Sequence, residues 1–468
     1  MSYLSLNLKK LKESSFTGFT ENSKFVKNDF VFISFSENIK EALNHSQEAI
    51  KNGAKFVISQ IDLKNELKEH NLFDKNLKEN KDKYLKQLFN RSINDIKIFG
   101  ITGTNGKSST AFFLHQLLIF KDINSTLLSN IPEILSYKNS EISPLTTPDR
   151  FLLKYYLKKS IDLKRDYFLM EVSSHGIDQG RIADLNFQGK CLTSFSQDHL
   201  DYHKSLRNYR NTKKSFFKET EKNNVISIDN ELGKELVSKN KSALSISLLK
   251  KNADILVEKG MIKTPWGDLK NTIPLKSKAM ISNILCALGL YGREFGKIDF
   301  DSKNLSLLKN LPGRLQRSTV FENKFCYVDY AHSPDALNFV LEYLKSSYSG
   351  QIITIFGCGG ERDSSKRKKM GKISEEKSNY QIITNDNPRN EDPFKIISEI
   401  SDGMMSKNYQ IILDRKEAIA EGLKKLKSLD PNSVLLVAGK GHENSQIVKD
   451  NEIHFNDLEI INELKDVI

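Results

Sequence analysis

A glycine-rich segment between an apolar run and a helical pattern constrains the fold of this chain most strongly. It reads GITGTNGKSST over residues 100–110, follows the apolar run at 96–99 and precedes a helical pattern over 111–120. Glycines let the backbone approach a phosphate closely, and the N–H groups at the start of a helix attract its charge. We therefore predict a phosphate-binding loop between a strand and a helix. Because Ile101 stands where the common GxxxxGK[ST] pattern has glycine, a plain tight turn is the alternative.

Apolar runs that alternate with helical patterns predict an α/β fold in several domains. With 468 residues, the chain exceeds the size at which single cores stop growing, about 250–300 residues. We expect domains at 1–92, 93–312 and 313–468, and we interpret the charged segment 62–90 as exposed helix or linker. In the last domain the runs QIITIF, YQIIT and SVLLVA lead into the polar loops GCGGERD, NDNPRNEDP and GKGHE. Ligands bind beyond the carboxyl ends of parallel strands, so these loops are expected to share one crevice.

The charge and cysteine patterns disfavour several classes of protein. The net charge is +12, but 71 Lys and Arg residues are interspersed with 59 Asp and Glu, which is typical of a solvated surface and argues against a nucleic-acid partner. Cys191, Cys286, Cys326 and Cys358 form no CxxC pair and indicate reduced thiols in the cytoplasm. Without a signal-peptide pattern or an apolar run of about 18 residues, we expect a soluble protein with no membrane partner. We also expect a monomer.

Three further segments carry polar residues whose role is ambiguous when each is taken alone. MEVSSHGIDQGR places Glu171 at the end of an apolar run, where its carboxylate could bind a metal or face solvent. SFSQDHLDYH gathers Asp198, His199, Asp201 and His203, which suits a zinc or magnesium site or the start of a helix. LTTPDR by itself predicts only a turn.

Taken together, nine motifs resemble those of the Mur ligases. They are GTNGKS, TTPD, EVSSHGxxxxR, DHLDYH, LPGRLQ, DYAHSPDAL, GCGGxRDxxKRxxM, DNPRxEDP and GKGHE, and the likeness runs from about residue 23 to 457. The resemblance implies three domains: an N-terminal UDP-binding domain, a central P-loop-type parallel-sheet domain that binds ATP, and a Rossmann-like C-terminal domain that binds an amino acid. It also implies an ATP-dependent ligase of peptidoglycan precursor synthesis, and so a role in cell-wall biogenesis, cell shape and cell division.

The resemblance implies a reaction and its cofactors. ATP, with Mg²⁺, phosphorylates the D-glutamyl carboxylate of UDP-N-acetylmuramoyl-L-alanyl-D-glutamate, and an amino acid then displaces phosphate from the acyl phosphate. Catalysis of this kind depends on positioning and on the neutralisation of charge. Lys107, Lys213 and His199 are the expected catalytic residues.

The resemblance also implies binding residues. For ATP they are Gly103, Thr104, Asn105, Gly106, Lys107, Ser108, Ser109, Asn283, Arg314, Asp329 and His332. For the nucleotide-dipeptide they are Ser23, Thr146, Thr147, Ser173, Gln179 and Arg181. For magnesium they are Ser108, Glu171 and Lys213 as a carbamate, with His199 nearby. The segment KSKAMISN, which ends at Asn283, departs from the family's glycine-rich pattern, and the motif around Ser23 matches only loosely.

Lys213 lies ten residues after His203, at the position where these ligases carry a carbamylated lysine. A plain ammonium repels Mg²⁺, whereas the anion of N6-carboxylysine could bridge a metal and orient a phosphate. The alternatives are that Lys213 is a solvated helix lysine, or that Lys214 has the role.

The loop NDNPR indicates which amino acid is added. Pro388 fixes its own φ and restricts Asn387, so the loop is expected to hold its side chains in a set geometry. The guanidinium of Arg389 suits a carboxylate, and meso-diaminopimelate, unlike L-lysine, carries one at its far stereocentre. DNPR resembles the loop of the diaminopimelate-adding enzymes, which implies binding by Arg362, Asp386, Asn387, Arg389, Gly439 and Glu443. A surface ion pair of Arg389 with Glu391 or Asp392 is the structural alternative.

Other functions compete with this assignment. The same ligase could add L-lysine, or the chain could perform another Mur step or act as a folylpolyglutamate-type ligase. A P-loop nucleotide switch would leave the DNPR and GKGHE loops without a role. A basic nucleic-acid-binding protein, which would show salt-sensitive affinity, ranks last.

Overall fold

The computed structural model of the chain describes residues 2–131, 140–218, 221–274, 277–406 and 408–468. These residues form two compact units. The first is built from the described parts of Met1–Gly100, Asp122–Asn130 and Lys138–Gln188, and the second from those of Ile101–Lys121, Ile131–Tyr137 and Gly189–Ile468. Among the described helices, none is long and apolar enough to cross a membrane.

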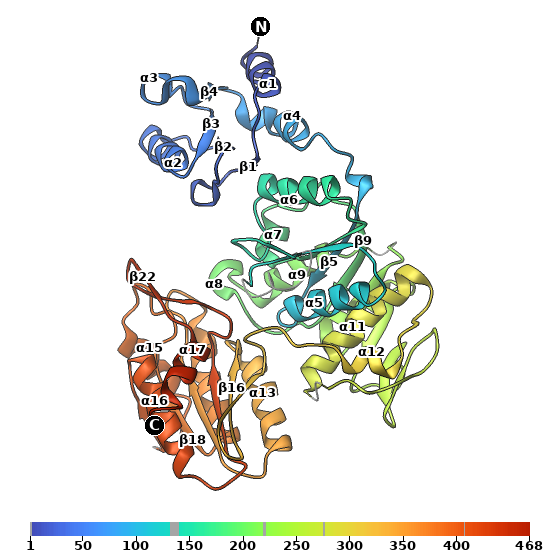
Figure 1. Ribbon diagram of the computed structural model, residues 1–468, viewed down its shortest axis with the longest axis vertical. Coiled ribbons are helices and arrows are strands. Elements are labelled where there is room, and N and C mark those ends of the chain that lie inside the picture. Colours follow the sequence, from blue (N-terminus) through green and yellow to red (C-terminus); the bar gives the residue numbers. More distant parts are fainter. Residues whose placement is uncertain (1, 132–139, 219–220, 275–276, 407) are drawn as a thin grey trace. The chain divides into compact units, whose positions relative to one another are not determined.

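The N-terminal part of the first unit is a four-stranded parallel sheet with helices around it (Figure 1). Its strands lie in the order β1-β2-β3-β4, and their bounds are Gly18–Thr20, Phe30–Ser34, Ala54–Ser59 and Asn71–Phe73. The helices are α1 (Tyr3–Glu13), α2 (Ile39–Lys51), α3 (Lys64–Leu67) and α4 (Leu77–Phe89), with short 3₁₀ turns at Ser23–Phe25, Lys68–His70 and Ile93–Asp95. Val31, Ile58, Tyr84 and Leu88 share one core with Phe151 of α6 (Arg150–Asp162).

The first unit also contains three further parallel strands. β6 (Ser125–Ser129) pairs with β7 (Ser140–Ile142) on one side and with β8 (Tyr167–Glu171) on the other. β8 is buried along its length and leads directly into α7 (Ser174–Asp178), whose first turn is capped by the Ser173 hydroxyl. A serine at this position satisfies a free N–H group at the helix start, so the turn after β8 has a defined shape.

The second unit begins with the helix that follows the glycine loop and with a run of parallel strands. α5 (Lys107–Ile119) follows β5 (Lys97–Thr102), which spans the division between the units. β9 (Phe187–Leu192), β10 (Asn224–Ser227), β11 (Leu244–Ser247) and β12 (Ile255–Glu258) are parallel neighbours, and β13 (Met261–Lys263) and β14 (Leu269–Lys270) are antiparallel. The helices of this part are α8 (Leu200–His203), α9 (Leu206–Ser215), α10 (Glu231–Lys239), α11 (Lys278–Phe295) and α12 (Ser302–Ser306).

The C-terminal part of the second unit is a six-stranded sheet in the order β15-β16-β20-β17-β18-β19. The strands are β15 (Gln316–Phe321), β16 (Lys324–Asp329), β17 (Ile352–Phe356), β18 (Tyr380–Ile383), β19 (Tyr409–Ile411) and β20 (Val434–Ala438); only the β15–β16 pair is antiparallel. The helices are α13 (Pro334–Ser347), α14 (Arg367–Lys377), α15 (Pro393–Ser401), α16 (Arg415–Ser428) and α17 (Asp457–Leu464), with a 3₁₀ turn at Ser364–Lys366 and a hairpin of β21 (Ser445–Val448) and β22 (Asn451–His454).

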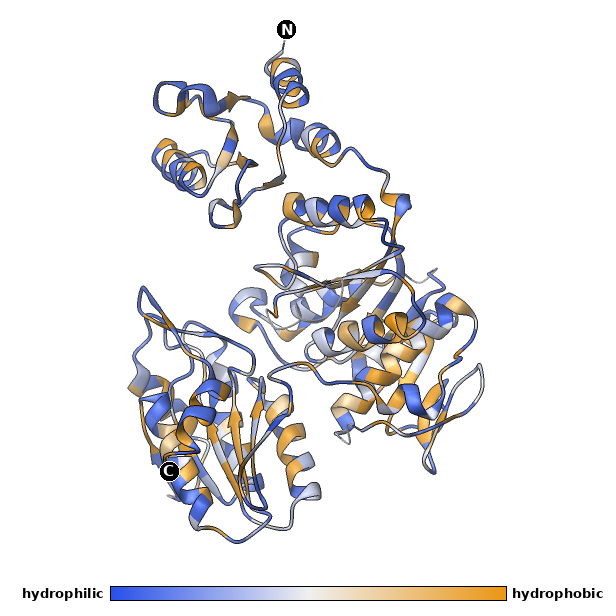
Figure 2. Cartoon of the chain, in the orientation of Figure 1, coloured by the Kyte–Doolittle hydropathy of each residue, from blue (hydrophilic) through white to orange (hydrophobic). Residues whose placement is uncertain are grey.

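Both faces of this sheet are covered by helices. One core contains side chains of α13, α14 and α15, among them Leu341, Met370 and Ile397, and the other contains Ile419 of α16 and Ile461 of α17. The central strands β17 and β20 are buried along their length, and the hydropathy colouring shows helices with both hydrophilic and hydrophobic residues around them (Figure 2). A parallel sheet buried on both sides is the arrangement that near-continuous apolar runs predict. The expected α/β fold is confirmed.

Candidate functional site

The glycine loop has a backbone shape that other residues could not adopt. Gly103 and Gly106 have φ angles of +152° and +86°, and Lys107 begins α5. A Cβ on Gly103 would collide with the Thr193 hydroxyl, and one on Gly106 would collide with the amide oxygen of Asn283. The expected turn from strand to helix is therefore present, and its two glycines are required by the conformation and by close packing.

The polar groups of the loop lie close to one another. Nζ of Lys107 donates to the carbonyls of Gly103 and Thr104, both at 3.0 Å. The Thr104 hydroxyl lies 3.1 Å from the hydroxyl of Tyr209, and the Asn105 amide donates to Ser194 Oγ at 2.9 Å. Ser108 is partly buried and Ser109 is buried, both in the first turn of α5. An ammonium, a hydroxyl and a helix start in this arrangement suit a phosphate group.

Lys213 and Lys214 have opposite environments although they are neighbours on α9. The side chain of Lys213 is buried, and its Nζ donates to the Gly103 carbonyl at 3.0 Å and to Thr102 Oγ1 at 3.3 Å. Burial and the charge of Lys107 hold the pKa of Lys213 well below its usual range. Nζ of Lys214 instead pairs with Glu235 at 2.6 Å. The lysine that faces the glycine loop is therefore Lys213.

The DHLDYH segment contains the whole of the short helix α8 and its N-cap residue. His199 has a left-handed φ of +54° and occupies the N-cap position of α8, and its amide donates to Asp198 Oδ1 at 2.9 Å. Burial acts to raise the pKa of Asp198, but the charges of His199 and Lys366 outweigh it and hold that pKa well below its usual range. Within the described ranges, no three His, Cys, Asp or Glu side chains gather in a way that could hold a metal ion.

In the first unit, several residues expected at the nucleotide-dipeptide meet around Thr147. Its hydroxyl donates to the Glu171 carbonyl at 3.0 Å and accepts from the Ser173 amide at 2.9 Å. Nη1 of Arg181 donates to the Thr147 carbonyl, and its Nε donates to the side-chain oxygen of Gln179 at 2.9 Å. Thr146 precedes this group and is partly buried, and the carboxylate of Glu171 is buried. The TTPD and EVSSHGxxxxR motifs thus form one cluster.

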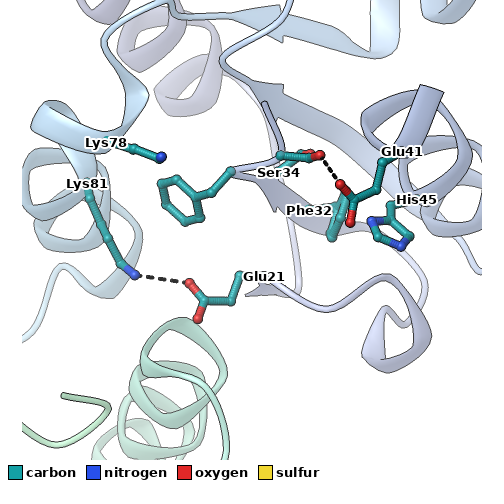
Figure 3. A pocket seen from close by; sticks show the side chains of 9 residues that line it. Glu21, Phe32, Ser34, Glu41, His45, Lys78 and Lys81 are labelled. Atoms are coloured by element: carbon teal, nitrogen blue, oxygen red, sulfur yellow. Dashed lines mark hydrogen bonds and ion pairs between the residues drawn. The ribbon is translucent and has the colours of Figure 1, made fainter. Parts of the chain in front are cut away.

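Ser23 lies apart from the pocket in its own domain. Its hydroxyl is buried and donates to Glu48 at 2.5 Å. A pocket of about 510 Å³ is lined by Glu21, Phe32, Ser34, Phe35, Ser36, Glu41, His45, Lys78 and Lys81 (Figure 3). Nζ of Lys81 pairs with Glu21 at 3.1 Å and lies 4.7 Å from the centre of the Phe35 ring. Sequence reasoning missed these residues; the available signal was the spacing of Lys78 and Lys81, which puts both on one face of a helix.

The other residues expected at ATP are also positioned by close contacts. Asn283 is buried on α11 beside Gly106. Arg314 stacks over the Tyr330 ring at 4.4 Å, and His332 Nδ1 lies 2.8 Å from the Tyr330 carbonyl. Burial raises the pKa of Asp329 to about 6 and lowers the pKa of His332 to about 4. Arg314, Asp329 and His332 thus lie around Tyr330.

The residues expected at the amino acid converge from three loops. The carboxyl ends of β17, β18 and β20 are adjacent, as predicted, because these strands are parallel neighbours. Gly439 has a φ of +115°, and a Cβ there would lie 2.6 Å from Asp386 Oδ2. The Asn387 amide donates to Glu443 Oε2 at 3.0 Å. Burial, with the nearby charge of Asp386, raises the pKa of Glu443.

Arg389 is held by backbone groups. Its φ is +52°, its Nη1 donates to the Gly360 carbonyl at 2.8 Å, and its amide donates to Ile447. The side chains of its alternative partners are engaged elsewhere: Glu391 accepts two hydrogen bonds from Arg367, at 2.7 and 2.8 Å, and Asp392 caps α15. Burial, with the charge of Arg362, lowers the pKa of Arg389. Arg362 is half exposed and lies 3.8 Å from Asp201.

Comparison with known proteins identifies the family. Residues 101–291 match the Mur ligase middle domain, and residues 313–441 match the Mur ligase glutamate ligase domain. A curated protein of Clostridium botulinum (strain ATCC 19397 / Type A), named UDP-N-acetylmuramoyl-L-alanyl-D-glutamate--2,6-diaminopimelate ligase, is 33% identical; the alignment covers 99% of this chain and 97% of that protein. The chain belongs to the Mur ligase family. A Fusobacterium nucleatum protein of the same name is 31% identical, with 96% and 93% covered.

Solved structures carry the same Mur ligase fold. A structure titled UDP-N-acetylmuramoyl-L-alanyl-D-glutamate--2,6-diaminopimelate ligase aligns with a TM-score of 0.56 and 26% identity, and the alignment covers 97% of this chain and 96% of that one. MurF from Acinetobacter baumannii aligns with a TM-score of 0.67 and 14% identity over 96% and 93% of the two chains, which shows the fold alone.

Buried basic residues around the loops of this Mur ligase were missed in the sequence. Nζ of Lys440 is fully buried and donates to Asn387 at 3.1 Å, to Glu443 at 3.0 Å and to the Ser445 carbonyl at 2.6 Å. Arg367 is also buried and donates to Glu391, to Glu399 and to the Gly359 carbonyl. Lys440 lies within the motif GKGHE and Arg367 within KRxxM. Both residues therefore stood in recognised motifs, but the sequence alone suggested no function for either.

Proposed function

We propose that this Mur ligase couples the hydrolysis of ATP to amide-bond formation between meso-diaminopimelate and UDP-N-acetylmuramoyl-L-alanyl-D-glutamate. The curated relatives that match it over nearly their full length carry the name of this ligase. The observation that carries the choice of amino acid is Arg389, whose guanidinium is partly buried and held on the Gly360 carbonyl at the edge where three loops meet.

The reaction requires activation of the carboxylate. A carboxylate does not condense with an amine in water because oxide is a poor leaving group. Transfer of the γ-phosphoryl group of ATP to the D-glutamyl carboxylate gives an acyl phosphate and ADP. The neutral amine of the amino acid then attacks the acyl carbon and forms the C–N bond, phosphate leaves with the electrons of the broken C–O bond, and the nitrogen releases one proton to give the amide. Lys107 and the loop N–H groups stabilise charge on the transferred phosphoryl group.

The nucleotide-dipeptide is held by residues of the first unit. The Thr147 cluster holds the guanidinium of Arg181, whose positive charge suits an anionic peptide. The 510 Å³ pocket combines aromatic rings with Lys78 and Lys81, which suits a base and phosphates of the UDP moiety. Ser23, which does not line this pocket, holds Glu48 of α2 through its hydroxyl.

Taken one by one, the residues expected at magnesium carry groups that this ion accepts as ligands. Mg²⁺ prefers oxygen ligands and keeps several waters, so it needs few protein ligands. Ser108 offers a hydroxyl and Glu171 a carboxylate, whereas the amine of Lys213 fits only as a carbamate. A buried lysine beside the loop favours the neutral amine that reacts with CO₂ to give this anion. When bound, the ion neutralises phosphate charge; Lys213 as N6-carboxylysine and His199 orient the groups around it.

The remaining assignments follow from the same reaction. Asn283, Arg314, Asp329 and His332 hold the nucleotide of ATP, and 1–92, 93–312 and 313–468 act as the three domains. The four free, buried cysteines favour a reducing compartment, and we place the enzyme in the cytoplasm as a monomer. Its product is a precursor for the cell wall, and through it the enzyme serves cell shape and division.

The decisive experiment measures ADP release by the full-length protein. The assay contains ATP, Mg²⁺ and UDP-N-acetylmuramoyl-L-alanyl-D-glutamate, and the added amino acid is varied among meso-diaminopimelate, L-lysine, D-alanine and L-glutamate. We expect release to depend on both substrates and to be fastest with meso-diaminopimelate. Release without any amino acid would favour a nucleotide switch, and preference for L-lysine would replace the proposed substrate.

A further inference from the structure

The loops that follow β18 and β20 are tied to one buried arginine. Arg415 begins α16, and only 1% of its surface is exposed. Its Nη2 donates to the Ala438 carbonyl at 3.0 Å, and its Nη1 donates to the Asn385 carbonyl at 3.3 Å. Asn385 directly precedes Asp386, and Ala438 directly precedes Gly439. One side chain therefore touches the base of both loops.

A third segment is attached to the same guanidinium. Nε and Nη2 of Arg415 donate to the two carboxylate oxygens of Asp457, at 2.7 and 2.8 Å, and both side chains are fully buried. Asp457 is the first residue of α17. A guanidinium presents its donors in a rigid plane, so it fixes the relative positions of its acceptors in a way that an ammonium cannot.

The two loops also contact one another near the proposed amino-acid site. Asn387 donates to Glu443 at 3.0 Å, and Gly439 leaves so little room that a Cβ there would lie 2.6 Å from Asp386. A small change in the separation of the loops would therefore move the acidic groups of Asp386 and Glu443 relative to each other.

We propose that Arg415 is a positioning residue for the amino-acid substrate. It sets the spacing between the Asp386–Asn387 loop and the Gly439–Glu443 loop through their backbone carbonyls, and Asp457 holds its guanidinium in the required plane. This inference rests on the proposed function, in which these loops bind the amino acid. It assigns Arg415 no contact with the substrate.

The test compares Arg415→Lys with wild type in steady-state assays of the full-length enzyme. We expect KM for meso-diaminopimelate to rise about tenfold or more, because misplaced binding groups lose affinity steeply. The KM values for ATP and for the nucleotide-dipeptide should stay unchanged, and the preference for meso-diaminopimelate over L-lysine should narrow. Lys416→Ala is the matched control: Lys416 follows Arg415 on α16 and pairs with Glu463 of α17 at 2.7 Å on the surface. It should leave all three KM values unchanged.

A second variant keeps the test informative if Arg415→Lys does not fold. Asp457→Asn keeps the size of the side chain and removes the ionic partner of Arg415, and it should raise the same KM. Folded variants with a lower Tm but an unchanged KM for the amino acid would overturn the proposal, and so would failure of both variants to fold, because the pair would then serve stability alone. A wild type that adds L-lysine would contradict the proposed substrate and not the role of Arg415, because the KM shift is then measured for L-lysine.

Discussion

At the scale of single residues, two adjacent lysines differ in what they can do. Lys213 is buried against the Gly103 carbonyl, whereas Lys214 forms an ion pair with Glu235. We expect Lys213→Ala to lose nearly all ligase activity, because it removes the group proposed to become a carbamate. Small carboxylates such as acetate should restore part of the activity by replacing that anion. Lys214→Ala is the matched control and should keep most of the activity in the same ADP-release assay.

Mass spectrometry of the protein after exchange with ¹³CO₂ gives an independent measurement. Wild type and Lys214→Ala should incorporate one labelled carboxyl group, and Lys213→Ala should incorporate none. Full activity of unrescued Lys213→Ala would rule out the carbamate.

The buried carboxyl of Asp329 predicts a pH-dependent stability. Burial raises its pKa from 3.8 to about 6. The folded state then keeps a proton that the unfolded state releases, so the stability contributed by the neutral carboxyl is present below about pH 4 and lost as the pH rises to about 6. Asp329→Asn does not titrate and keeps an acceptor for the Leu315 amide. Its free energy of unfolding relative to wild type should therefore increase by on the order of 3 kcal/mol between pH 4 and 7.

Urea denaturation of both proteins at the two pH values measures this difference. A constant difference between Asp329→Asn and wild type would mean that the carboxyl is already ionised at pH 4.

At the scale of elements, the sequence predicted the strands that lead into the proposed amino-acid loops. β17, β18 and β20 correspond to the apolar runs QIITIF, YQIIT and SVLLVA, and each ends at the expected polar loop. Continuous apolar runs are readable because these strands are buried on both faces. Two helix starts are also readable from local sequence. Pro334 begins α13 and Pro393 begins α15, and proline suits the first position of a helix because the N–H group that it lacks would have no partner within the helix.

Elements that depend on tertiary contacts were not predicted. The interpretation of 62–90 as exposed helix or linker was right about a helix, since the segment contains α3 and α4. It was wrong about exposure, because Tyr84 and Leu88 of α4 are buried in the N-terminal core, and it missed β4. The lysines of α4 hide that buried face in the sequence. The roles of Lys440 and Arg415 were missed for a similar reason, since a buried cation is recognisable only when the acceptors around it are known.

The close packing of Gly106, in the glycine loop, against Asn283 of α11 predicts how alanine at this position would affect stability. Gly106 has a φ of +86°, and its missing side chain leaves room for Asn283 of α11. Gly296 also has a positive φ, of +65°, but nothing lies within 4 Å of a Cβ placed there. Gly296→Ala should therefore cost about 1 kcal/mol of backbone strain. Gly106→Ala should cost roughly 1–3 kcal/mol more through the collision, and it should weaken ADP binding.

Urea denaturation and calorimetric titration with ADP measure the two effects. Equal destabilisation by the two alanines would contradict the close packing of Gly106 on Asn283.

At the scale of the whole molecule, the proposed reaction assigns roles to residues of both units. The Thr147 cluster belongs to the first unit, and the phosphate loop, Lys213 and the amino-acid loops belong to the second. These groups are separated by long stretches of chain, and the proposal that they serve one reaction is supported by the order of the motifs and by a relative whose alignment covers 99% of the chain. A change in one loop should therefore affect one substrate and leave the others.

Substitution of Arg389 tests whether a change in one loop affects one substrate only. Its guanidinium is proposed to meet the far carboxylate of meso-diaminopimelate, a group that L-lysine lacks. A partly buried polar side chain that binds one group of a substrate discriminates strongly against a ligand that lacks this group. Wild-type kcat/KM should therefore favour meso-diaminopimelate over L-lysine by on the order of 10⁴-fold. Arg389→Ala should lose most of its activity with meso-diaminopimelate and narrow that ratio, while KM for ATP stays unchanged. Arg317→Ala, which removes an exposed arginine of the same domain, is the control and should change neither quantity. Comparable wild-type kcat/KM values for the two amino acids would show that Arg389 does not select the substrate.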